Sequence, residues 1–284
     1  MFTSRISSFY PLYTHRSILF ARRFMSTAIA LNPSEFVDFK LKNIESLTHN
    51  TSRFTFELPE HQSLGLHVAS CILTKFIGPD GKPVIRPYTP TSETYVKGSW
   101  DLIIKRYDTG IMSSHIHNLK VGDTLSVKGP ISKYPLKVNQ HKSIALIAGG
   151  SGLTPILQLI YSILHDKEDV TKINFIFANV TPDDIILKDV LDELVKTHPD
   201  QLKVTYVVSR PPAEGWIGET GRVNAEMIRR HVPEIGTEGN KVFVCGPPGM
   251  MNAISGPKNP DLTQGELIGA LKDLGLTSEQ VFKF

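Results

Sequence analysis

The pattern of apolar residues changes near residue 140, and this change limits the folds open to the chain. Before it, apolar and polar residues alternate in short stretches separated by proline and glycine, which is typical of half-buried β-strands. After it, short buried strands alternate with stretches whose apolar residues recur at helical spacing. We therefore predict a β + α/β protein, with an antiparallel β-barrel domain over residues 35–139 and a parallel-sheet α/β domain over residues 140–284.

The expected elements follow from these periodicities. In the first domain we expect strands at 37–41, 54–58, 68–76, 100–106 and 124–128 and one helical piece at 112–119. In the second we expect strands at 143–148, 172–178, 203–208, 241–245 and 282–284 and helices at 224–231 and 264–274. Two further helices are predicted to start at Thr154 and Thr181, because each threonine is an N-cap candidate followed by a proline.

Residues 1–34 differ in composition from the rest of the chain. They contain four arginines and no aspartate or glutamate, whereas the remaining residues include 27 basic and 28 acidic side chains. An acid-free segment rich in arginine and serine predicts a mitochondrial presequence, with processing after Phe24, and the alternative is a disordered tail. Because the basic excess belongs to this segment, the composition does not favour nucleic-acid binding.

Membrane, disulfide and metal signals are weak in this sequence. Every apolar stretch is shorter than the ~20 residues that a bilayer-spanning helix needs, so no transmembrane helix is predicted. The two cysteines, Cys71 and Cys245, are too few for a disulfide scaffold, and no Cys/His cluster indicates a metal site.

The first motif with chemical meaning is Arg86-Pro87-Tyr88-Thr89-Pro90. The planar guanidinium of an arginine suits a phosphate group. In an extended segment Tyr88 points the same way as Arg86, so its ring is placed to lie against a flavin ring, and Thr89 is placed to hydrogen-bond it. The alternative is an ordinary edge strand, because sheet edges tolerate proline.

The second motif is the glycine-rich turn Gly149–Pro155, between a predicted strand and a predicted helix. Glycines let a diphosphate approach the backbone, and a helix N-terminus favours its negative charge. The spacing differs from the G-x-G-x-x-G fingerprint of dinucleotide-binding folds. A tight strand-to-helix turn without a ligand is therefore the alternative interpretation.

The third motif is Cys245-Gly246-Pro247-Pro248-Gly249-Met250, which follows a predicted parallel strand. Ligands of open parallel sheets bind at the carboxyl ends of the strands, so the Cys245 thiol is placed to contact a nicotinamide ring. No neighbouring base in the sequence makes it a nucleophile. The alternative is a small buried cysteine, which is common in protein cores.

Together, these ordered motifs and the chain ending resemble the NADH–cytochrome b5 reductases, within the ferredoxin–NADP reductase-like flavoproteins. The resemblance runs from Phe36 to Phe284, is strongest to fungal mitochondrial members, and includes the stretches 252–257, 264–267 and 280–284. It implies that NADH gives a hydride to FAD and that the flavin passes single electrons to cytochrome b5 or a similar small haem protein.

The resemblance also implies roles for individual residues. It places Thr89, Thr154 and Cys245 where the two cofactors meet. The other cofactor-binding residues that it implies are Arg86, Pro87, Tyr88, Ile103, Lys105, Tyr107, Gly110, Met112, Ser113, Gly150, Gly152, Gly246, Pro247 and Met250.

Three positions depart from the family pattern. Ile111 stands where the diphosphate loop normally has a lysine, which predicts weaker FAD binding. Residues 65–69 lack the usual Gln-His pair and carry no role. Ser209-Arg210 replaces an Asp-Arg pair, and because an aspartate repels a 2′-phosphate, we hypothesise that this chain uses NADPH better than its relatives. A harmless surface change is the alternative interpretation.

The sequence therefore predicts an FAD-dependent NAD(P)H reductase that acts on a small haem protein in mitochondria. One alternative keeps the fold but has a quinone or an iron–sulfur protein as the electron acceptor. Another is a non-catalytic mitochondrial protein that retains the fold. We expect a monomer that contacts membranes, if at all, through its partner.

Overall fold

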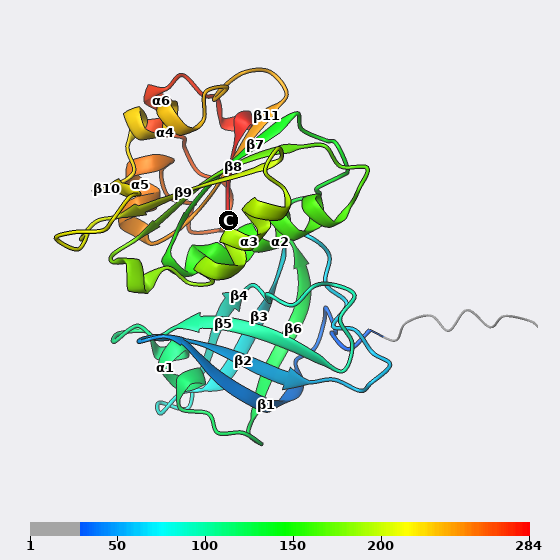
Figure 1. Cartoon of the computed structure of the whole chain (residues 1–284). Helices are drawn as coiled ribbons and strands as arrows, with labels where there is room; N and C mark the ends of the chain where they lie inside the picture. The colour runs from blue at the N-terminus through cyan, green and yellow to red at the C-terminus, as the bar shows by residue number, and fades with distance from the viewer. Residues whose placement is uncertain (1–28) are drawn as a thin grey trace, which may run out of the picture.

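The computed structural model describes residues 29–284, which form two sheet-based domains placed one above the other (Figure 1). Most of the predicted presequence, including the processing position after Phe24, lies outside the described residues. Residues 29–32, which by composition belong with the leader, pack against the first domain: the Leu31 side chain is buried in its core, and the Ala30 amide donates to the Ser63 carbonyl. Among residues 29–284, no helix has both the length and the apolar character needed to cross a membrane.

The first domain is a six-stranded antiparallel sheet in the order β4-β3-β6-β1-β2-β5. Ile72, near one end of this order, and Trp100, in the strand at the other end, belong to the same buried core. The sheet therefore curves around that core as a partly open barrel, with β4 and β5 at its edges. Its elements are β1 (Val37–Thr48), β2 (Thr51–Glu57), β3 (Ser70–Ile77), β4 (Pro83–Tyr88), β5 (Ser99–Lys105), α1 (Ile111–His117) and β6 (Thr124–Ser132).

The second domain is a six-stranded parallel sheet in the order β10-β9-β8-β7-β11-β12. Both faces of this sheet are covered, because Leu146 of β7 packs with α2 and α3, whereas Ile147 packs with α4, α5 and α6. Its elements are β7 (Ser143–Gly149), α2 (Leu153–His165), β8 (Lys172–Asn179), α3 (Lys188–Thr197), β9 (Leu202–Val208), β10 (Glu219–Thr220), α4 (Ala225–His231), β11 (Asn240–Cys245), α5 (Pro248–Ile254), α6 (Ala270–Asp273) and β12 (Val281–Lys283).

Both predicted threonine-proline helix starts are wrong in detail. A 3-10 turn over Gly150–Gly152 precedes α2, so its N-cap is Gly152, and Thr154 lies inside the first turn with its hydroxyl 3.3 Å from the Ser151 carbonyl. The Thr181 capping box closes only the 3-10 turn Pro182–Asp184. The backbone becomes extended after that turn, and α3 starts at Lys188.

The predicted helix over 264–274 is also wrong, because only Ala270–Asp273 is helical. The Gln264 side chain pairs instead with the backbone of Lys283, accepting from its amide at 2.7 Å and donating to its carbonyl at 3.1 Å. Gly269 has φ of +72°, which a right-handed helix cannot include. The sequence patterns also do not predict the helix α5 or the short strand β10.

The two domains meet where the site residues of both must lie. β5 of the first domain contacts the 3-10 turn before α2, and the C-terminus lies between the domains (Figure 1). The carboxyl ends of β7, β8, β9 and β11 all face one edge of the parallel sheet. Ligands of open α/β sheets bind at this edge.

Candidate cofactor site

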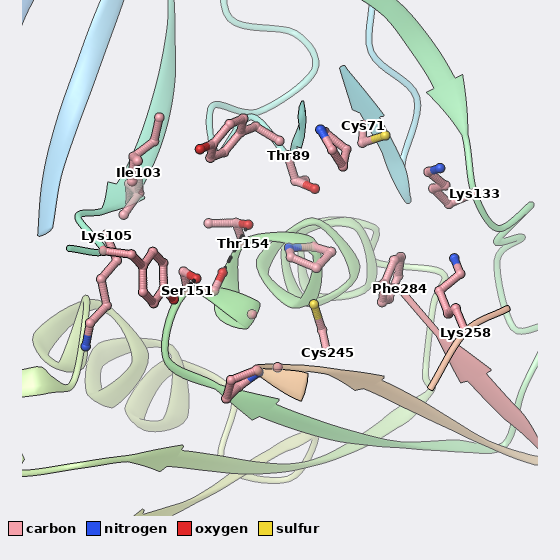
Figure 2. Close-up of a pocket in the computed structure, with 18 of the residues that line it drawn as sticks. Cys71, Thr89, Ile103, Lys105, Lys133, Ser151, Thr154, Cys245, Lys258 and Phe284 are labelled. Atoms are coloured by element: carbon pink, nitrogen blue, oxygen red, sulfur yellow. Dashed lines mark hydrogen bonds between the residues drawn. The ribbon is translucent and has the colours of Figure 1, made fainter. Parts of the chain in front are cut away.

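A cavity of about 340 Å³ lies between the two domains. The barrel contributes the end of β4 and the strand β5, and the α/β domain contributes the turn before α2, the end of β11 and the C-terminus (Figure 2). The cavity brings together eleven of the predicted residues: Pro87, Tyr88, Thr89, Ile103, Lys105, Tyr107, Gly152, Thr154, Cys245, Gly246 and Pro247.

A second cavity, of about 510 Å³, opens along the carboxyl ends of the parallel strands. Lys105, Tyr107 and Pro247 line both cavities, so these side chains form the boundary between them. Gly150, Ser209 and Met250 line only the second cavity. The arrangement therefore provides two adjoining spaces for two ligands that share one contact zone.

The glycines of the second motif are required by close backbone approach. A Cβ atom on Gly152 would lie 2.2 Å from the Cys245 carbonyl oxygen, and one on Gly149 would lie 2.5 Å from the Met250 sulfur. Gly150 has φ of +54°, and a Cβ atom there would meet no atom within 4 Å, so this glycine leaves open space at the second cavity. Gly149 and Gly152 let the ends of β7 and β11 pack closely under both cavities.

A side-chain contact crosses the boundary between the domains. The Tyr107 hydroxyl lies 3.0 Å from the Ser151 hydroxyl and hydrogen-bonds it. Tyr107 belongs to the barrel and Ser151 to the turn before α2. Because Tyr107 lines both cavities, this bond fixes the wall that separates them.

The Cys245 thiol lies in the cavity and is not a nucleophile at neutral pH. Burial raises its pKa to about 12, although the nearby ammonium of Lys258 opposes the rise. Its sulfur points into the cavity in Figure 2. A protonated thiol in this position offers a polarisable contact surface for a flat ring.

Lys105 is held by an ion pair that the sequence patterns do not predict. Its Nζ lies 2.9 Å from Asp184 Oδ1, and the two side chains are 15% and 7% exposed. Burial would raise the pKa of Asp184, but the bonds from Lys105 and Thr181 outweigh it and lower this pKa. The pair links β5 of the barrel to the α/β domain and holds the ammonium group at the wall shared by the two cavities.

Five predicted residues line neither cavity: Arg86, Gly110, Met112, Ser113 and Arg210. The Ser113 hydroxyl donates to the Gly110 carbonyl and accepts from the Tyr107 amide, so it holds its own loop. Arg86 is exposed on β4, which α1 contacts, and no carboxylate among residues 29–284 pairs with it. The Arg86 guanidinium donates instead to the Ile85 carbonyl at 2.7 Å, so it remains without an anionic partner within the described residues.

Arg222, rather than Arg210, lines the second cavity with Ser209. Arg210 follows Ser209 in the chain and is also exposed, but it lies in the bend after β9 and lines neither cavity. Arg222 follows β10, which pairs with the end of β9. A residue brought in by sheet pairing leaves no signal in the local sequence.

Several other cavity residues carry no sequence signal for the same reason. Four of them come from distant segments and belong to none of the three motifs: Cys71, Lys133, Lys258 and Phe284. Ser151 lies inside the glycine-rich turn, but the motif assigns it no role. The aromatic chain ending is the one partial exception, because its pattern predicts a strand, although not a cavity wall.

The residues present fit FAD. The first cavity has an aromatic ring, hydroxyl groups and apolar walls for a flat ring system, and an exposed arginine stands beside it for a phosphate. The second cavity lies where parallel sheets bind nucleotides and is large enough for part of a dinucleotide.

Comparisons with known proteins agree with this geometry. Residues 38–135 match the model of the oxidoreductase FAD-binding domain, and residues 146–256 match that of the oxidoreductase NAD-binding domain. The chain is 51% identical over 251 residues to NADH-cytochrome b5 reductase 2 of Coccidioides immitis, covering 88% of this chain and 77% of the relative. It is 50% identical over 252 residues to the protein of the same name in Candida albicans, covering 88% and 83%.

A solved structure supports the same assignment. The cytochrome b5 reductase domain of Ulva prolifera nitrate reductase superimposes with a TM-score of 0.78 at 31% identity, covering 90% of this chain and all of that domain. The predicted fold class and the predicted cofactors, FAD and NADH, are thereby confirmed. The chain belongs to the NADH-cytochrome b5 reductase family and is an oxidoreductase with one FAD-binding and one NAD-binding domain.

Proposed function

We propose that this protein oxidises NADH and delivers the electrons one at a time to cytochrome b5 or a similar small haem protein. The observation that carries the proposal is the pair of adjoining cavities that share Lys105, Tyr107 and Pro247 as a wall. A flavin bound in the first cavity and a dinucleotide bound in the second would adjoin at this wall. The names of the relatives support cytochrome b5 as the acceptor.

The protein's own residues contribute binding and orientation. Thr89 and Cys245 face each other across the first cavity (Figure 2), and Tyr88 and Pro247 also line it, so these residues would hold a flat ring. Burial raises the pKa of Tyr88 to about 12, so its hydroxyl stays protonated and its ring remains neutral. When bound, FAD supplies the conversion of a two-electron hydride donor into single-electron transfer.

Lys105 gives the shared wall a positive charge. Lys105 is the member of the buried pair that lines both cavities, and Asp184 keeps its ammonium group in place. A positive group at this wall favours the anionic dinucleotide and holds it in line with the flavin. Hydride transfer between the two cofactors would need no general acid or base from the protein, so these residues would act by binding and orientation.

Anaerobic titration of the purified protein tests this proposal. We expect an FAD absorption spectrum that is bleached by one equivalent of NADH and restored by two equivalents of oxidised cytochrome b5. A quinone and a small iron–sulfur protein are the comparison acceptors. If either of these acceptors reoxidised the flavin faster than cytochrome b5, the assignment of the acceptor would be refuted. If the protein bound no FAD after reconstitution, the proposal that it is a flavoenzyme would be refuted.

We also propose that NADPH is accepted alongside NADH. Ser209 lines the second cavity without a negative charge, and the Arg222 side chain lines the same cavity. A serine and an arginine together suit a 2′-phosphate. Ser209→Asp should lower kcat/KM for NADPH by about tenfold or more and leave NADH less affected. Arg210→Leu is the matched control, because Arg210 lines neither cavity; equal losses in both variants would exclude this assignment.

A mitochondrial location is proposed from the arginine-rich, acid-free leader alone. Import of the full chain by isolated mitochondria should shorten it near Phe24 and protect it from added protease. Replacing Arg5, Arg16, Arg22 and Arg23 with serine should prevent import. Import of this variant at the normal rate would contradict the proposal.

A further inference from the structure

Two lysines, Lys133 and Lys258, line the first cavity without an acidic partner. Lys133 follows β6, where its amide donates to the Ala69 carbonyl at 2.9 Å, and Lys258 belongs to the loop after α5. Figure 2 shows both ammonium groups on the same side of the cavity, beside Phe284 and across from Lys105. No carboxylate within the described part of the chain lies within 4.0 Å of either group.

The two positive charges act on each other. Burial lowers the pKa of Lys258, and repulsion from Lys133 lowers it further. The thiols of Cys71 and Cys245 oppose this lowering, but burial raises the pKa of both, so they stay neutral at physiological pH. In the absence of a ligand, the arrangement has a net positive charge in a partly desolvated space.

Hydrogen bonds from Lys283 hold the loop that carries Lys258 in position. Lys283 is 2% exposed, and its ammonium group donates to three carbonyls of the Lys258 loop, those of Pro257, Gly265 and Glu266, at 3.1, 3.4 and 2.7 Å. Gln264 adds the two bonds to the Lys283 backbone described above. The loop that carries Lys258 is thus fastened to β12 and cannot swing away to relieve the repulsion.

We propose that Lys133 and Lys258 form a charge site that stabilises the reduced flavin. The inference rests on the proposed function. Transfer of a hydride from the dihydronicotinamide brings two electrons and one proton to the flavin ring, so a neutral ring becomes an anion unless a second proton follows. Two ammonium groups without counter-ions in the same cavity favour that anion over the neutral oxidised ring.

The test measures the reduction equilibrium rather than the turnover. Lys133→Met and Lys258→Met, each saturated with FAD, are reduced slowly with dithionite in the presence of a reference dye, so NADH is not involved. Each variant should shift the equilibrium between oxidised and reduced flavin about tenfold toward the oxidised form, which corresponds to about 30 mV for two electrons. Lys137→Met is the matched control, because Lys137 is exposed on the following segment and lines neither cavity.

Arginine variants separate charge from shape. Lys133→Arg and Lys258→Arg keep the charge and should retain at least most of the wild-type potential, whereas a purely structural role would not be rescued in this way. The dissociation constant of oxidised FAD is measured in parallel. An unchanged potential in both methionine variants would overturn the inference, as would a weaker FAD affinity with an unchanged potential.

The two experiments distinguish a failure of this inference from a failure of the proposed function. Flavin potentials that shift as expected in a protein that NADH fails to reduce would support the charge site and refute the reductase activity. Normal reduction by NADH, with potentials that match the Lys137→Met control, would support the activity and refute the charge site. A protein that binds no FAD would refute both.

Discussion

The ion pair between Lys105 and Asp184 gives the most quantitative prediction. Its two charged atoms are 2.9 Å apart, and the side chains are 15% and 7% exposed. Removing one partner of a buried pair costs about 3–5 kcal/mol, because the other charge is left buried without compensation. In Lys105→Met the Asp184 carboxylate still accepts bonds from the Thr181 amide and hydroxyl, so we expect the lower end, about 3 kcal/mol.

A double-mutant cycle isolates this interaction. Asp184→Asn keeps the bonds to Thr181 and leaves Lys105 free to reach the solvent in the cavity, so its cost should be smaller, about 2 kcal/mol. The double variant should cost less than the sum of the two, with a coupling energy of about 2 kcal/mol. Lys196→Met, which removes an exposed ion pair with Glu193, is the control and should cost less than about 0.5 kcal/mol.

The assay is urea denaturation of the FAD-saturated protein, followed by circular dichroism. Because the folded-state pKa of Asp184 is lowered, its charged form contributes stability above its ordinary pKa of 3.8, and this contribution is lost as the pH falls through the folded-state pKa. The difference between wild type and Lys105→Met should therefore shrink below about pH 3.8. If Lys105→Met is as mild as Lys196→Met at pH 7, the pair does not couple the domains.

The remaining predictions concern the walls of the cavity. Gly152→Ala should destabilise the protein by about 1–3 kcal/mol and weaken FAD binding, because its new methyl group would overlap the Cys245 carbonyl; calorimetry and FAD titration measure both effects. Tyr107→Phe should cost about 0.5–1.5 kcal/mol and Ser151→Ala should add nothing to it, which a urea-denaturation cycle would show or contradict. Lys283→Met should cost about 1–3 kcal/mol, since it leaves three partly buried carbonyls without their side-chain donor; a loss below about 0.5 kcal/mol would mean that water replaces the ammonium group.

Local sequence patterns predict much of the fold. Alternation over Phe54–Leu58 reports one buried face of a strand, and the structure places Phe54 and Phe56 in the barrel core. The stretch 143–148, which is apolar after Ser143, indicates a strand covered on both faces, and it forms the central strand β7. Both patterns depend only on which side of the backbone meets the core, so they are readable without knowledge of the partners.

The starts of helices and the elements near the C-terminus are less predictable from the sequence. Thr181 is an N-cap as predicted, but the turn it caps ends at Asp184, because the backbone is extended at Ile185. The helix α3 begins only after Leu187, which has φ of +56°. Gln264 lies in a stretch with helical character, yet its amide binds the distant strand β12. In both places a tertiary contact or a backbone turn outweighs the local preference.

The motifs predict which strand ends contribute residues to the cofactor site, but not which other side chains lie beside those residues. The motifs Arg86–Pro90 and Cys245–Met250 place Thr89 and Cys245 on opposite sides of one cavity, because each motif lies at the end of a strand (Figure 2). Arg222 reaches Ser209 through the pairing of β10 with β9, and Asp184 reaches Lys105 across the domain boundary.

The sequence alone therefore determined the two kinds of sheet, the family and the strand ends that face the cofactors. Only the tertiary structure decided that Lys133 and Lys258 share a cavity and that Phe284 closes it. The physical reason is range: periodicity and turn chemistry act over a few neighbouring residues, whereas these side chains meet through sheet order and the packing of one domain on the other.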